Sequence, residues 1–125
     1  MTSGGLEFGA YDFTSPAPLE SIGTLLVKCP QGLAFRIRMD AGQGPSLDFS
    51  PRFMQSTATN ARIAYNLYVD PSRTLIWGNG DRSTMVFSGV GSGFPIQIPI
   101  FGRVFPGQPV PPGAYQDRVT ITLEW

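Results

Sequence analysis

The sequence predicts an all-β sandwich that forms a single domain over residues 1–125. Apolar and polar side chains alternate with a period of two, and helical periodicity is nowhere sustained. Fifteen glycines and 12 prolines in 125 residues argue against a helix bundle. Clusters of Gly, Pro, Asn, Asp and Ser separate about seven or eight short strands, a spacing typical of a sandwich, with a small barrel as the competing architecture.

The expected strands are short, and each lies between clusters of turn residues. The second one, for example, is bounded by the proline-rich stretch 16–18 and by the turn at 30–32. In chain order, the strands are expected at residues 6–11, 22–29, 33–39, 61–70, 74–77, 84–87, 96–104 and 115–125.

Alternation is clear in the third and fourth expected strands. In the fourth, Tyr65 and Leu67 fall on the apolar face and Asn66 falls on the polar face. The stretch 41–59, between these two strands, holds few apolar residues, which predicts a long surface loop.

Glycine and proline constrain two later segments. The stretch 88–93 is glycine-rich, but a strand rather than a helix follows it, which favours a flexible loop over a phosphate-binding loop. The strand at 96–104 contains Pro99 and follows Pro95. Because proline cannot donate to a ladder, this strand is expected at a sheet edge or to be bulged.

The last expected strand has the most regular alternation. Its even-numbered positions are polar, which predicts one face on the core and one face in water. The apolar face carries Val119, Ile121, Leu123 and Trp125.

Composition excludes several classes of function. The chain has no His, which excludes histidine bases, nucleophile–histidine pairs and histidine metal ligands. Cys29 is the single cysteine, so neither a disulfide within the chain nor a cysteine metal cluster can form. Nine basic residues balance nine acidic ones, and no apolar run is long enough to span a bilayer. We therefore expect a non-enzymatic domain without cofactor, metal, nucleic-acid partner or membrane insertion.

Several short strings in a fixed order give the chain a family resemblance. They are LEFGAYD at 6–12, YNLY at 65–68, WGNG at 77–80, FGRV at 101–104 and GAYQD at 113–117. In this order, the strings resemble the spore coat protein U domain family, which also supplies the subunits of archaic chaperone–usher pili. The resemblance covers about residues 6–125, and the combination is far more specific than any one string.

The resemblance implies an immunoglobulin-like sandwich that lacks its last strand. A periplasmic chaperone would first fill the open groove with one of its strands, and the neighbouring subunit would later replace that strand by β-strand addition. The resemblance places the walls of this groove in the first and last strands, at Leu6, Phe8, Val119, Ile121, Leu123 and Trp125.

The function that the resemblance implies is structural. We expect a pilus subunit for adhesion and biofilm formation at the cell surface, with neighbouring subunits, a periplasmic chaperone and an outer-membrane usher as partners. Two alternatives stay open, namely a spore or cell coat protein and a surface-binding tip adhesin with Phe94, Phe105 and Val110 as exposed loop residues. Family members usually have an upstream segment that holds a cysteine and the donor strand. A disulfide to Cys29 is therefore expected in a longer, exported form.

Overall fold

The fold is described here from a computed structural model, which covers residues 2–3, 18–42, 52–80, 84–110, 115–117 and 119–125. No helix in these ranges is long and apolar enough to cross a membrane. The regular structure in these ranges consists of β1 (Thr2–Ser3), β2 (Leu19–Val27), β3 (Ala34–Met39), β4 (Arg52–Ser56), β5 (Arg62–Tyr68), β6 (Phe87–Val90), β7 (Ile96–Val104), β8 (Tyr115–Gln116) and β9 (Ile121–Glu124).

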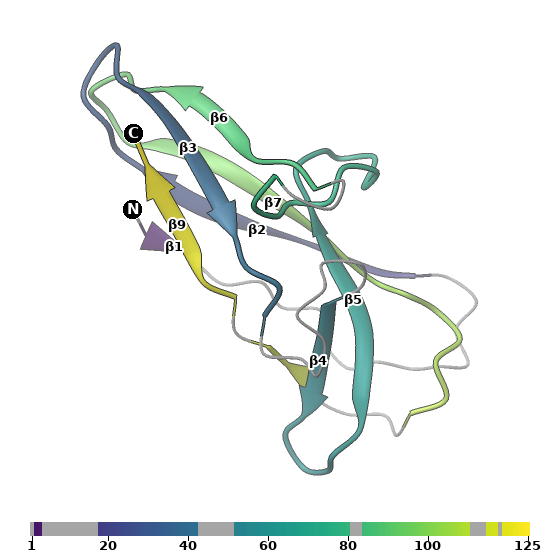
Figure 1. The fold of residues 1–125 in the computed structure, drawn as a ribbon. Coiled ribbons are helices and arrows are strands. Elements are labelled where there is room, and N and C mark those ends of the chain that lie inside the picture. The colour runs from purple at the N-terminus through teal and green to yellow at the C-terminus, as the bar shows by residue number, and fades with distance from the viewer. Residues whose placement is uncertain (1, 4–17, 43–51, 81–83, 111–114, 118) are drawn as a thin grey trace.

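These strands form two antiparallel sheets that share one core (Figure 1). The larger sheet has the order β1-β2-β7-β5-β4-β8, and the smaller sheet has the order β6-β3-β9. In the larger sheet, β7 pairs with the whole length of β2, from Leu19↔Val104 to Val27↔Ile96. In the smaller sheet, β3 lies in the middle. The predicted all-β class is confirmed.

The core lies between the sheets and follows from the alternation of each strand. In β2, for example, Leu25 and Val27 are fully buried, whereas Leu26 between them is 41% exposed. Trp77 is the largest fully buried side chain, and its Nε1–H donates to the carbonyl of Ile37 at 2.9 Å. The WGNG string therefore begins with a residue that fills the centre of the sandwich.

The loop expected at 41–59 is wrong in its second half, because β4 occupies residues 52–56 there. This strand lies inside the larger sheet, between β5 and β8, and both Arg52 and Met54 are buried. Asn66 was expected on the polar face of its strand but is 1% exposed. The amide tolerates burial because its Oδ1 accepts hydrogen bonds from Arg52 Nη1 and from the N–H of Leu67.

The edge position expected for the strand at 96–104 is also wrong, since β7 lies between β2 and β5 in continuous register. The Phe105 N–H donates to the Ala64 carbonyl of the β5 chain, and backbone N–H groups alternate in direction along a strand. The nitrogen of Pro99 therefore points to the side of β5, beyond Tyr68, the last paired residue. An interior strand tolerates Pro99 because its partner on that side has already ended.

Other expected elements are shorter than the pattern indicated. Within the glycine-rich stretch, residues 88–90 belong to β6 and pair with β3, so the flexible loop is wrong there. The strand at 74–77 is reduced to isolated bridges at Ile76 and Trp77, and Phe87 is the one residue of 84–87 in a named strand. The last expected strand is divided into β8 and β9. The first, at 6–11, lies outside the described residues.

Candidate functional site

The outer edge of β9 is the candidate site. Asp40 donates its N–H to the carbonyl of Thr120 at 3.0 Å, so the even-numbered residues of the final strand direct their backbone groups toward β3. The backbone groups of Ile121 and Leu123 consequently point the other way, toward the edge. Figure 1 shows β9 at the margin of the smaller sheet. In the described part of the chain, no strand pairs with this edge.

The side chains of this edge are less covered than those of the strand beside it. Ile37 and Met39 in β3 are 0% and 1% exposed, because β3 has a neighbour on each side. Their cross-strand partners Leu123 and Ile121 are only partly buried, although they pack against the same core. The final strand thus presents apolar side chains and outward-directed backbone groups together, which are the two features that β-strand addition uses.

The structure brings three of the expected groove residues together, since Val119, Ile121 and Leu123 all pack against the core. Trp125 follows the end of β9 and is 78% exposed. Leu6 and Phe8, expected on the opposite wall, lie outside the described residues.

A buried polar cluster lies where the chain enters β9, and no sequence pattern indicates it. Arg52 is 0% exposed, and its Nε and Nη2 donate to the carbonyl of Asp40 at 3.0 and 2.6 Å. Its Nη2 also donates to the carbonyl of Trp77 at 2.7 Å. Burial lowers the pKa of the Arg52 guanidinium from its usual value. No alternation of apolar and polar residues marks residues 52–56, because the charged Arg52 stands at a buried position, so the segment resembles a loop in the sequence.

Tyr65 and Asp117 form a second part of this cluster. The Tyr65 hydroxyl donates to Asp117 Oδ2, and the tyrosine is 3% exposed. Burial, together with the hydrogen bond to Asp117, raises the pKa of Tyr65 above its usual value. The hydroxyl therefore stays protonated and acts as a donor.

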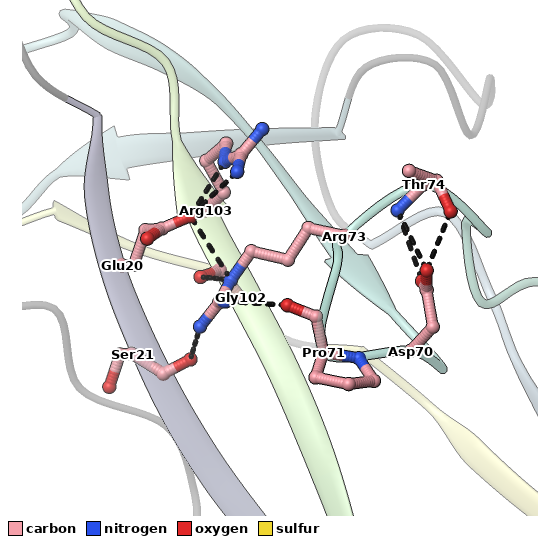
Figure 2. A network of polar contacts seen from close by, with 8 residues as sticks. All are labelled: Glu20, Ser21, Asp70, Pro71, Arg73, Thr74, Gly102 and Arg103. Atoms are coloured by element: carbon pink, nitrogen blue, oxygen red, sulfur yellow. Dashed lines mark hydrogen bonds and ion pairs between the residues drawn. The ribbon is translucent and has the colours of Figure 1, made fainter.

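A separate polar network ties the turn after β5 to the larger sheet (Figure 2). Arg73, which has a positive φ of 56°, donates from Nε to the carbonyl of Gly102 at 3.1 Å. Arg103 donates from Nε and Nη2 to Glu20 Oε2 at 2.9 and 2.7 Å, and this hydrogen bonding lowers the pKa of Glu20. Asp70 holds Thr74 through both its N–H and its hydroxyl. These contacts cross-link β2, β7 and a turn, which is a structural role.

Cys29 is 3% exposed and lies two residues after Val27, the last residue of β2. Its carbonyl accepts a hydrogen bond from the N–H of Gly93 at 2.9 Å. A Cβ on Gly91 would lie 2.2 Å from the carbonyl oxygen of Pro30, so only glycine fits there. The glycine-rich stretch therefore serves to pack closely against the region of Cys29.

The loop residues expected for an adhesin do not gather at one place. Phe94 precedes β7 and is 74% exposed, whereas Phe105 follows β7. The nine residues of that strand separate them by about 30 Å. Val110 packs against the core. In the described ranges, no group of three His, Cys, Asp or Glu side chains could hold a metal ion.

The chain is similar to known proteins both in sequence and in fold. The family model described as Spore Coat Protein U domain matches residues 1–122. A protein named Protein U from Myxococcus xanthus is 32% identical over 129 residues, which covers 96% of this chain and 71% of that protein. A chain in the crystal structure of the CsuC–CsuE chaperone–tip adhesion subunit pre-assembly complex, from archaic chaperone–usher Csu pili of Acinetobacter baumannii, aligns with a TM-score of 0.61 at 21% identity. That alignment covers 92% of this chain and 37% of the other.

Proposed function

The chain belongs to the Spore Coat Protein U domain family, and from this premise we propose that it is a structural subunit that assembles by accepting a β-strand along β9. In this proposal, a periplasmic chaperone supplies the first strand, and the neighbouring subunit of an archaic chaperone–usher pilus replaces it after passage through an outer-membrane usher. The role is structural rather than catalytic, and the assembled fibre lies at the cell surface, where it serves adhesion and biofilm formation.

The observation that carries the proposal is the edge of β9. Ile121 and Leu123 direct their backbone groups toward this edge, while their side chains are only partly buried. A donor strand would extend the smaller sheet and cover these side chains in one step. Likeness in fold to a chain of a chaperone–subunit pre-assembly complex supports a chaperone as a partner in this proposal.

The energy of such a contact is large compared with the stability of a domain. An inserted strand with four or five apolar side chains gains roughly 6–15 kcal/mol from burial, before the costs of ordering and association. The free energy of unfolding of an ordinary domain is about 5–15 kcal/mol. The chain without a donor is therefore expected to be marginally stable, and its assembly is expected to be hard to reverse.

A fusion tests the proposal. An alternating apolar strand joined after Trp125 through a short flexible linker should give a monomer that melts well above the unfused chain. The measurements are calorimetry for the melting temperature and light scattering for the oligomeric state. If the unfused chain is already a monomer that melts as high as the fusion, the sandwich needs no donor and the proposal is wrong.

Two matched variants locate the effect at β9. Leu123→Glu places a charge on the partly buried face and should abolish most of the gain from the fusion, because the donor would have to bury an unpaired carboxylate. Thr122→Glu places the same charge on the exposed face, opposite Arg38, and should leave the gain intact. Each variant is compared with and without the fused strand, so that its own effect on stability cancels.

A second candidate function is a subunit of a spore or cell coat. The family description, Spore Coat Protein U domain, favours it, together with the likeness to Protein U from Myxococcus xanthus over 96% of this chain. The same β9 edge would join the subunits, so the two candidates differ in the shape of the assembly rather than in the contact. Electron microscopy of the native assembly separates them, since a pilus appears as fibres and a coat appears as a layer.

A further inference from the structure

We infer that Asp40, held in place by Arg52, fixes the register in which β9 pairs with β3. This inference rests on the proposed function only in its consequence, which is that the register decides what β9 offers to an incoming strand. Asp40 and Arg52 are positioning residues in this account, because neither would touch the donor.

Asp40 holds Thr120 at two points. The backbone N–H of Asp40 donates to the carbonyl of Thr120 at 3.0 Å, and Oδ1 of Asp40 accepts the N–H of Thr120 at 2.9 Å. The same Oδ1 accepts the N–H of Gly42 at 2.9 Å, which orients the carboxylate. One residue therefore binds both backbone groups of Thr120, directly before β9 begins.

Arg52 fixes the position of Asp40. Two of its nitrogens donate to the Asp40 carbonyl, and other bonds of the guanidinium reach the carbonyl of Trp77 in the core and Asn66 in β5. Because the guanidinium is fully buried and planar, it cannot shift without breaking several of these bonds. The anchor of the small sheet is thus tied to β4 and β5 of the large sheet.

The register needs such an anchor because β3 and β9 share only four residue pairs. Besides the backbone bonds of this ladder, the side chains of Arg38 and Glu124 form an ion pair at 2.6 Å, which is about 40% exposed and hence weak. The alternation of β9 already opposes a slip by one residue, which would turn Ile121 and Leu123 to the solvent face. A slip by two residues keeps both side chains on the core face, so alternation does not oppose it, whereas the bonds of Asp40 to Thr120 do. Such a slip would move the apolar row of β9 by about 7 Å along the edge, so that a donor strand would meet that row out of position.

The test compares Asp40→Ala, Asp40→Asn and Asp70→Ala in the full chain. Asparagine keeps the acceptor oxygen, so Asp40→Asn should retain the register, whereas Asp40→Ala should lose it. Asp70 makes similar carboxylate bonds to Thr74 and Leu75 in a turn remote from β9, so Asp70→Ala controls for general destabilisation. Should Asp40→Ala fail to fold, Asp40→Ser replaces it, because the shorter side chain does not reach Thr120.

Two readouts separate the register from the proposed function. The first is NMR contacts between the Hα atoms of Met39 and Ile121 and of Ile37 and Leu123, which face each other as non-hydrogen-bonded pairs. These contacts should be present in the parent, Asp40→Asn and Asp70→Ala, and should be lost in Asp40→Ala. The second is the affinity for a synthetic alternating apolar strand, which should fall about tenfold or more in Asp40→Ala alone.

Each outcome has one meaning. Retention of both Hα contacts in Asp40→Ala, or their equal loss in Asp70→Ala, overturns the inference. If the peptide binds no variant, including the parent, the proposed function fails while the Hα contacts still decide the register. If the contacts are lost and the peptide still binds Asp40→Ala as tightly as the parent, then the register does not control strand acceptance and the inference fails in its consequence.

Discussion

Arg52 keeps a guanidinium group in the interior of the sandwich, where an unpaired cation would be very costly. The surrounding oxygens of Asp40, Trp77 and Asn66 accept its hydrogen bonds, so the charge is solvated by protein rather than by water. No pattern of alternation reveals such a site, since Arg52 occupies a position that alternation assigns to an apolar residue. The candidate site is therefore held by a residue that lies in the stretch 41–59, where the sequence predicts a surface loop.

Replacing this side chain should be among the most destabilising single changes in the chain. Arg52→Ala is expected to lower the free energy of unfolding by about 3–5 kcal/mol, because it leaves buried carbonyl oxygens without donors and opens a cavity. Urea denaturation followed by tryptophan fluorescence measures the loss. Arg62→Ala, at an exposed position of β5, serves as the control and should change stability by less than about 0.5 kcal/mol. A similar small change at Arg52 would show that the buried network contributes little.

Tyr65 predicts a specific dependence of stability on alkaline pH. Because burial and Asp117 raise its pKa, the folded chain keeps a proton that the unfolded chain loses near pH 10. The contribution of Tyr65 is complete below pH 10 and is lost as the pH rises above it, by up to about 1.4 kcal/mol per pH unit. Urea denaturation between pH 8 and pH 11 should show a shallower decline for Tyr65→Phe than for the parent. Parallel declines would mean that Tyr65 ionises alike in both states.

At the level of elements, β6 depends on a close approach to β3. Gly89 lies opposite Phe35, and a Cβ there would come within 2.7 Å of the Phe35 ring. Gly89→Ala should therefore lower the free energy of unfolding by about 1–3 kcal/mol, as overpacking does in other cores. Thermal unfolding measures the loss. Ser88→Ala, at the neighbouring exposed position, is the control and should change the melting temperature little. An unchanged melting temperature for Gly89→Ala would show that the ring moves aside at no cost.

The sequence predicts a strand where one of its faces is apolar and the other is polar. It does not predict a strand whose burial depends on neighbours that are distant in the chain. The strands β3, β5 and β9 were predicted because one face of each is apolar, and that property is local. The burial of β4 depends on β5 and β8, which are distant in sequence, so its short and charged segment resembled a loop. Pro99 correctly indicated a missing hydrogen bond, but only the end point of β5 shows how an interior strand can accept it.

The candidate site, too, could be predicted only in part from the sequence. The apolar row of the last strand was visible as alternation, and the resemblance to a family supplied the expectation of an open groove beside it. The direction of the backbone groups could not be predicted, because it depends on which residue of β3 lies opposite each residue of β9. That pairing is set by Asp40 and Arg52, whose contacts join segments far apart in the chain.

For the whole molecule, the proposed mechanism makes stability a function of donor concentration. A synthetic alternating apolar strand added to the unfused chain should raise the melting temperature in proportion to the logarithm of its concentration. At one hundred times its dissociation constant, the gain is about 2.7 kcal/mol, which corresponds to roughly 5–20 °C for a domain of this size. A peptide of the same composition with its apolar residues in one block is the control. Equal shifts with both peptides would indicate non-specific binding.

The long ladder between β2 and β7 also affects how fast the chain can fold. Leu19 pairs with Val104, so most of the chain must be synthesised and must close on itself before the central ladder of the larger sheet can form. The smaller sheet likewise waits for its last strand, since Ile37 pairs with Leu123. Chains dominated by such distant pairings fold in milliseconds to seconds, and throughout that interval their unpaired strands can join those of other molecules. A partner that covers β9 early would therefore protect a slow-folding chain from such contacts until the ladders of both sheets have formed.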